Sequence, residues 1–196
     1  MRILGIDPGS TSMGFAVIEQ KPGSLQSLTY GTTDIKKAGG LPAKLVEIKR
    51  VLLELIEEHS PDAAGIERLF FSKNKKTAFE VAQARGVILL TLQECSIPII
   101  ELTPGEIKLA VTNYGAADKA MVRKMVMLLL NLKTLSADDN ASDALATAIA
   151  AANNKTNKKI STLGWSLPVD SRSSITIIVI FKNLSSLRVT KPGEYD

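Results

Sequence analysis

The chain has 196 residues, 45% of them hydrophobic, which is enough for one substantial core and favours one α/β domain with an appendage over two full domains. A formal net charge of +4 and a pI near 9.1 suit a polyanionic partner such as nucleic acid, although charge alone is weak grounds. One histidine, His59, and one cysteine, Cys95, argue against Ser-His-Asp, Cys-His and multi-histidine sites and rule out an intrachain disulfide.

The sequence also predicts where the protein works. No basic-then-apolar signal peptide opens it, and no uninterrupted apolar run approaches the roughly 20 residues that a membrane helix needs. Cys95 is expected to be a small buried hydrophobic residue. We therefore expect a cytoplasmic protein without a membrane partner.

The first part of the chain predicts a small antiparallel meander. Turn signals of the type PGS and KPGS separate three expected strands, at residues 3–7, 13–19 and 26–34. Apolar residues then recur at helical spacing over residues 41–59, until Ser60-Pro61 ends the helix.

Strands and helices alternate in the next part. A buried strand is expected at residues 63–67, a basic loop RLFFSKNKK follows it, and the later elements are a helix at 77–94, a strand at 97–101, and helices at 103–112, at 117–130 and from about 138–140 through ALATAIAAA. The order βββαβαβααα predicts an α/β protein with a mixed five-stranded sheet flanked by helices, which is the element order of the ribonuclease-H-like fold.

The character of the sequence changes after Asn153, where polar, basic and loop-like segments begin. We predict a domain over residues 1–152 and a C-terminal extension over 153–196, to which we assign no role. The apolar run ITIIVIF, residues 175–181, predicts a β-strand that is too short to span a membrane.

Two acidic residues stand at predicted strand ends. Asp7 precedes the turn Pro8-Gly9-Ser10, and Glu67 ends the fourth strand. If these strands are neighbours, both carboxylates point into one depression, where their repulsion is costly unless a cation is present.

A second acidic group stands at the start of the last helix and consists of Asp138, Asp139 and Asp143. Asn140 and Asp143, three residues apart, share one helical face. Oxygen ligands without histidine or cysteine suit Mg²⁺ or Mn²⁺ and two-metal hydrolysis of a phosphodiester. Taken singly, each acid also suits ordinary turn, strand-end or helix-start chemistry; their joint occurrence indicates a site.

Five segments occur in the order and spacing of the blocks of one known family: GIDPGSTSMGFAV, IERLFFSKN, AQARGV, NYGAADKAMVRKMV and DNASDALATAIA. Over residues 1–152 the chain resembles the RuvC Holliday-junction resolvases. The resemblance implies a Mg²⁺-dependent endodeoxyribonuclease with a nuclease domain at 1–152, acting in DNA recombination and repair. It further implies a homodimer that binds a four-way junction on a basic face, nicks two opposed strands symmetrically and works with a branch-migration motor.

The resemblance also implies roles for individual residues. Asp7, Glu67 and Asp143 fall on the family's catalytic, metal-binding carboxylates. The remaining family ligand is Asp or His, and Asn140 stands at that position; an amide offers an oxygen but no charge. The neighbouring Asp139 is the alternative ligand, and metal affinity is expected to be weaker if neither reaches the ion.

Further residues match the family's contacts with DNA. Phe70 falls where an aromatic side chain stacks near the junction centre, although core packing is the alternative for Phe70 or Phe71. Lys108 and Lys119 match lysines close to the scissile strand, or else belong to a solvated helix face. Three lysines of the basic loop complete the set of expected DNA contacts: Lys73, Lys75 and Lys76.

Two points stay open. Arg85, in AQARG, is either a structural residue or a phosphate contact, and Asn113 replaces the first glycine of its block.

Sugar-kinase-like ATPases share the GIDPGST-type turn but need a second phosphate loop and a longer chain. A module that only binds nucleic acid, and a ribonuclease-H-like enzyme with another substrate, are the remaining alternatives.

Overall fold

The computed structural model describes residues 1–35, 39–68, 75–135 and 139–155. The predicted strand at 175–181 lies outside these ranges. The domain boundary predicted after residue 152 falls within a helix that continues to Lys155. Within the described ranges, no helix is both long and apolar enough to cross a membrane.

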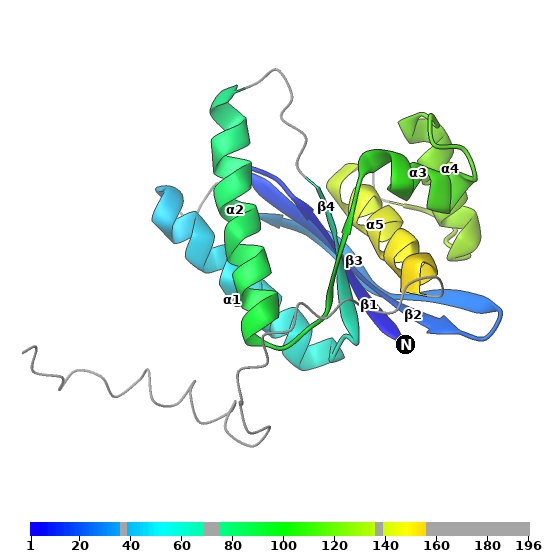
Figure 1. Cartoon of the computed structure of the whole chain (residues 1–196), viewed down its shortest axis with the longest axis horizontal. Helices are drawn as coiled ribbons and strands as arrows, with labels where there is room; N and C mark the ends of the chain where they lie inside the picture. Colours follow the sequence, from blue (N-terminus) through cyan, green and yellow to red (C-terminus); the bar gives the residue numbers. More distant parts are fainter. Residues whose placement is uncertain (36–38, 69–74, 136–138, 156–196) are drawn as a thin grey trace, which may run out of the picture. The chain divides into compact units, whose positions relative to one another are not determined.

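A mixed sheet lies between the helices, with its strands in the order β3-β2-β1-β4-β5 (Figure 1). The strands are β1 (Arg2–Pro8), β2 (Ser12–Lys21), β3 (Ser24–Asp34), β4 (Ala63–Glu67) and β5 (Ile99–Leu102). The first three pair antiparallel, whereas β4 pairs parallel with β1, and β5 parallel with β4. The predicted meander and mixed five-stranded sheet are confirmed.

The helices begin and end where local chemistry favours it. They are α1 (Leu41–His59), α2 (Lys75–Glu94), α3 (Pro104–Thr112), α4 (Lys119–Leu129) and α5 (Asp139–Lys155). Thr103 and Glu106 form a capping box at the start of α3, and the Asp118 side chain accepts from the Met121 amide at the start of α4. Ser60 ends α1 with a left-handed backbone, as the predicted helix stop requires.

The two faces of the sheet carry different layers. Helices α1 and α2 pack on one face, and α5, with α3 and α4 beyond it, packs on the other (Figure 1). Because successive side chains of a strand point to opposite faces, Leu4 and Ile6 of β1 join the α1/α2 core, while Ile3 joins the α5 core. Asp7 has the same parity as Ile3 and so belongs to the α5 face.

Several predicted boundaries differ from the observed ones: the helix expected at 117–130 is Lys119–Leu129, and the helix expected at 77–94 begins at Lys75. The strand expected at 97–101 begins at Ile99, because the Ile97 amide donates to the Leu92 carbonyl at 2.9 Å and closes the turn that follows α2. Ser96 in this turn has a φ of 56°. Cys95 lies in the same turn and is half-buried, where the sequence predicted a buried side chain.

Candidate active site

The ends of β1 and β4 bring two carboxylates side by side. Ile6 pairs with Ile66 in the parallel ladder, so Asp7 and Glu67 follow at adjacent positions on neighbouring strands. Both have the parity that faces α5. The expectation that these two strands are neighbours is confirmed, and a parallel pair places such residues about 5 Å apart between strands.

Close approach of α5 to the sheet supplies the third carboxylate. A Cβ atom on Gly5 would lie 2.1 Å from the carbonyl oxygen of Ala144, and one on Gly14 would lie 2.1 Å from the carbonyl oxygen of Asn140. These are backbone atoms of the helix, so only glycine fits beneath it. The first turns of α5 therefore lie against the sheet next to Asp7 and Glu67, and Asp143 is carried there.

Glu67 and Asp143 lie within electrostatic reach of each other. Burial raises the pKa of the Glu67 carboxyl, and the negative charge of Asp143 raises it further, while Lys119 and Lys108 oppose the shift. Burial also raises the pKa of Asp143, whereas the positive charge of Lys119 lowers it. The structure thus brings together Glu67, Asp143 and both lysines that the sequence singled out.

Lys119, the first residue of α4, pairs with the acids at the start of α5. Its Nζ lies 3.4 Å from Asp143 Oδ2 and 3.5 Å from Asp139 Oδ2. The pKa of Lys119 is raised, chiefly by the charge of Asp143. Because Lys119 and Asp139 are each about 70% exposed, this ion pair adds little to stability and its members can exchange partners.

Asn140 and Asp139 have different surroundings. The side-chain amide of Asn140 donates to Ser12 Oγ at 2.6 Å, which holds this residue toward β2. Asp139 instead interacts with Lys119 and with the charge of Asp143. Of the two alternatives for the remaining ligand, Asp139 is the one whose carboxylate shares its cationic neighbour with Asp143.

The expected DNA contacts of the basic loop are only partly in view. Phe70 and Lys73 lie outside the described residues. Lys75 and Lys76 form the first positions of α2, for which the backbone alone is described. These four residues stay predictions.

The residues at this edge of the sheet suit a metal ion chemically. Their donors are carboxylate oxygens, and the pKa values of Glu67 and Asp143 are raised first by burial, and then by the charge of Asp143 at Glu67 and of Asp139 at Asp143; a cation bound there would favour the charged forms. Among the described residues, no three side chains of Asp, Glu, His or Cys lie close enough together to hold a metal ion. Lys119 provides the positive charge near Asp143 in this arrangement.

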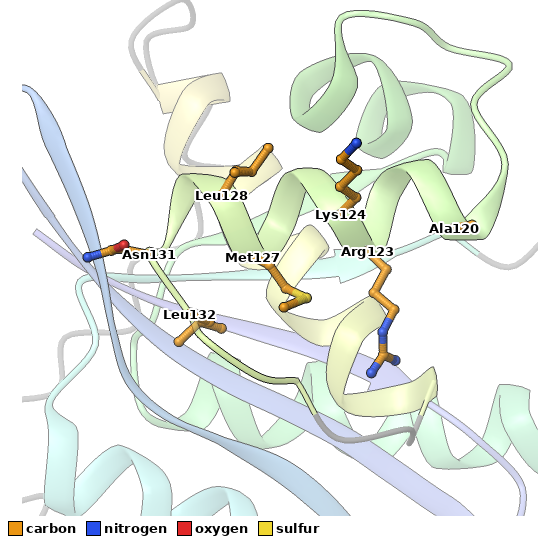
Figure 2. Close-up of a pocket in the computed structure, with 7 residues that line it drawn as sticks. All are labelled: Ala120, Arg123, Lys124, Met127, Leu128, Asn131 and Leu132. Atoms are coloured by element: carbon orange, nitrogen blue, oxygen red, sulfur yellow. The ribbon is translucent and has the colours of Figure 1, made fainter.

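The carboxylates are not among the residues that line the pocket of this structure. The pocket in Figure 2, of about 390 Å³, belongs to α4 and the turn after it. Its lining residues are Ala120, Arg123, Lys124, Met127, Leu128, Asn131 and Leu132. None of these is a candidate ligand, so the carboxylate site at the ends of β1 and β4 lies apart from the pocket.

Comparison with known proteins identifies relatives of the whole described region. The family described as crossover junction endodeoxyribonuclease RuvC matches residues 3–151. A protein of Syntrophomonas wolfei with that name is 44% identical over 149 residues, which are 76% of this chain and 87% of the relative.

Solved structures agree with this family. The structure of Thermus thermophilus RuvC has a TM-score of 0.73 and 28% identity, covering 80% of this chain and 96% of the other. T. thermophilus RuvC in complex with Holliday junction substrate has a TM-score of 0.72 and 25% identity, with the same coverage of 80% and 96%. The predicted ribonuclease-H-like fold is confirmed, and the chain belongs to the RuvC family of crossover junction endodeoxyribonucleases.

Proposed function

We propose that this protein is a structure-selective endonuclease that resolves four-way DNA junctions by divalent-metal-dependent phosphodiester hydrolysis, in recombination and repair. The observation that carries the proposal is the placement of Asp7 and Glu67 at adjacent strand ends with Asp143 on the helix that packs over them. The structure of T. thermophilus RuvC in complex with Holliday junction substrate has the same fold and 25% sequence identity, which supports a junction as the substrate.

Asp7, Glu67 and Asp143 would hold Mg²⁺, or Mn²⁺, with two ions per site, and Asp139 or Asn140 would complete the set. Because no three acidic side chains of the described residues are close enough together as they stand, these side chains would have to move toward the ion when it binds. The bound metal would supply a hydroxide nucleophile at neutral pH and stabilise charge on the departing 3′ oxygen. Asp139 is the better supported alternative, because its carboxylate shares Lys119 with Asp143, whereas Asn140 donates its amide to Ser12.

The lysines of the site act on the phosphate. Lys119 and Lys108 both lower the pKa of Glu67, so their positive charges reach the place where the scissile phosphate would lie. Lys119 is 70% exposed, with its Nζ 3.4 Å from Asp143 and 3.5 Å from Asp139, so its amine has room to move to a phosphate oxygen. There it would orient the phosphate and stabilise the charge that develops on it.

The segment after Glu67 is proposed to contact the junction. Phe70 stands only three residues after Glu67 in the sequence. Stacking of Phe70 on an unpaired base, with Lys73, Lys75 and Lys76 on phosphates, would hold the junction over the site. Replacing Lys73 and Lys76 by alanine tests this, since an unchanged salt dependence of binding would remove the segment from the interface.

A homodimer would allow two opposed strands to be cut symmetrically. The outward face of α2 supports it: Phe79 is 72% exposed and Leu90 56% exposed, and a Cβ on Gly86 between them would meet nothing. Sedimentation equilibrium tests the dimer, and a monomer mass at micromolar concentration would contradict it. We also propose that the protein works beside a branch-migration motor in the cytoplasm. Co-purification of the protein with the motor from cell extract tests this.

The decisive experiment is cleavage of a synthetic four-way junction by the full chain with Mg²⁺ or EDTA, alongside linear duplex and an RNA–DNA hybrid. We expect paired, symmetric, metal-dependent nicks on the junction alone. Asp7→Asn should bind the junction normally and cut it at least about a thousandfold more slowly, because a ligand is lost without a change in side-chain size. Binding without cleavage by the unaltered protein would indicate a module that only binds DNA.

A further inference from the structure

Arg85 of α2 is partly buried and reaches the strand that carries Glu67. Its side chain is 17% exposed. The guanidinium forms an ion pair with the carboxylate of Glu101 on β5, and its Nε donates to the main-chain carbonyl of Glu67 at 3.4 Å. One side chain therefore joins three elements, α2, β4 and β5.

These contacts fall where the sheet ends. Glu67 is the last residue of β4, and the Arg68 amide after it donates to the Leu102 carbonyl at 2.7 Å. The ends of strands are among the parts of a fold that open most readily. The guanidinium of Arg85 links the Glu67 carbonyl at this strand end to α2.

Arg85 is poorly placed to bind a phosphate. Its charge is already neutralised by Glu101, and exposing it to DNA would leave Glu101 without this partner. Arginine presents several N–H groups in a fixed plane, which suits simultaneous contact with a carboxylate and a carbonyl.

We propose that Arg85 is a positioning residue, which fixes the main chain at Glu67 so that the Glu67 carboxylate keeps the orientation needed for metal binding. The proposal rests on the proposed function, because it concerns the same carboxylate. Glu101 supports the same role, since its ion pair with Arg85 orients the guanidinium.

The test compares Arg85→Ala, Arg85→Lys and Glu101→Gln with Arg50→Ala as a matched control. Arg50 is an arginine of α1 that also pairs with glutamates, Glu47 and Glu54, but on the exposed surface. Mn²⁺ binding is measured by electron paramagnetic resonance, junction affinity in Ca²⁺, and the single-turnover cleavage rate as a function of Mg²⁺ concentration.

We expect Arg85→Ala to weaken Mn²⁺ binding and raise the Mg²⁺ concentration for half-maximal cleavage by about tenfold, as loss of a supporting contact does in metal sites, with junction affinity unchanged. Arg85→Lys should recover part of this loss. Adding Glu101→Gln to Arg85→Ala should weaken Mn²⁺ binding little further, since both residues act through the same ion pair. Arg50→Ala should match the unaltered protein.

Two results would overturn the proposal. Weaker junction binding with a reduced salt dependence would make Arg85 a phosphate contact. A lower melting temperature with unchanged Mn²⁺ binding and Mg²⁺ dependence would make it a purely structural residue. If the unaltered protein binds Mn²⁺ through Glu67 but does not cut junctions, the proposed function is wrong. The role of Arg85 is still tested in that case, because its effect on Mn²⁺ binding is measured independently of cleavage.

Discussion

The two faces of the sheet are built from residues of different size. On the α1/α2 face, β1 contributes Leu4 and Ile6, which pack with large aliphatic side chains such as Leu52. On the α5 face, β1 contributes Gly5, and the helix above it offers Ala144 and Ala148. Large side chains pack between the sheet and helices α1 and α2, whereas small residues let the backbone of α5 come close to the sheet.

This difference separates stability from the chemistry of the site. The α1/α2 face supplies buried apolar surface, whose loss lowers stability wherever it occurs. The close approach on the α5 face sets where Asp143 stands relative to Asp7 and Glu67. A change on either face should destabilise the protein, and a change on the α5 face should also displace the carboxylates.

The largest expected effect comes from comparing Gly5→Ala with Leu52→Ala. Leu52 is fully buried, so its truncation should lower the free energy of unfolding by about 2–5 kcal/mol. A methyl group on Gly5 would meet the Ala144 carbonyl at 2.1 Å and must push α5 away, with an overpacking cost of about 1–3 kcal/mol or more. Urea unfolding measures both losses.

Cleavage per folded molecule distinguishes the two variants. Leu52→Ala should cut junctions at the normal rate at temperatures where it is folded, whereas Gly5→Ala should lose at least about a hundredfold, since misplacement by 1 Å has that effect on positioned groups. Equal rates for both variants would show that the approach of α5 does not position the carboxylates.

A smaller effect is expected from the residues that begin α5. Asn140→Asp replaces a neutral amide by a carboxylate, and should lower the Mg²⁺ concentration for half-maximal cleavage by about tenfold. Asp139→Asn should raise it by a similar factor if Asp139 completes the present set. A Mg²⁺ titration of single-turnover cleavage measures both changes. If Asp139→Asn leaves the titration unchanged, Asn140 or neither residue is the ligand.

The smallest effect concerns stability without metal. A carboxyl whose folded pKa is raised contributes stability when protonated, and this contribution is lost as the pH rises from the ordinary value of 4.5 through the raised value. Glu67→Gln removes that loss, so at pH 7 without metal the variant should melt about 1–3 °C higher than the unaltered protein. Mg²⁺ should raise the melting temperature of the unaltered protein more than that of the variant.

Differential scanning calorimetry at pH 5 and pH 7, with EDTA or Mg²⁺, tests this sign. The advantage of Glu67→Gln should be larger at pH 7 than at pH 5. An unaltered protein that is more stable than the variant in EDTA at pH 7 would contradict the inference that Glu67 carries uncompensated charge in the fold.

Much of the fold was predictable, because its signals are local. Turn residues such as Pro8 and Gly9 and the apolar spacing over 41–59 depend on neighbours in the chain, so the meander and α1 followed from the sequence. The error at Ile97 also has a local cause, since an apolar residue that closes a turn through the Leu92 carbonyl resembles the start of a strand.

The candidate site was predictable in its members and less so in its arrangement. Asp7, Glu67 and Asp143 could be named from the ends of the elements that carry them. Glu101 was missed, because an acid within the short strand IIEL looks like an ordinary exposed position. Only the ion pair with Arg85, which joins segments 16 residues apart, distinguishes Glu101 from other exposed acids.

The sequence by itself determined which elements form and which residues carry charge, because periodicity, turns and caps act over a few neighbouring residues. Only the tertiary structure decided that Asp139 pairs with Lys119, that Asn140 turns to Ser12, and that Arg85 reaches the Glu67 carbonyl. Each of these contacts joins segments far apart in the chain, and depends on how closely α5 and α2 pack on the sheet.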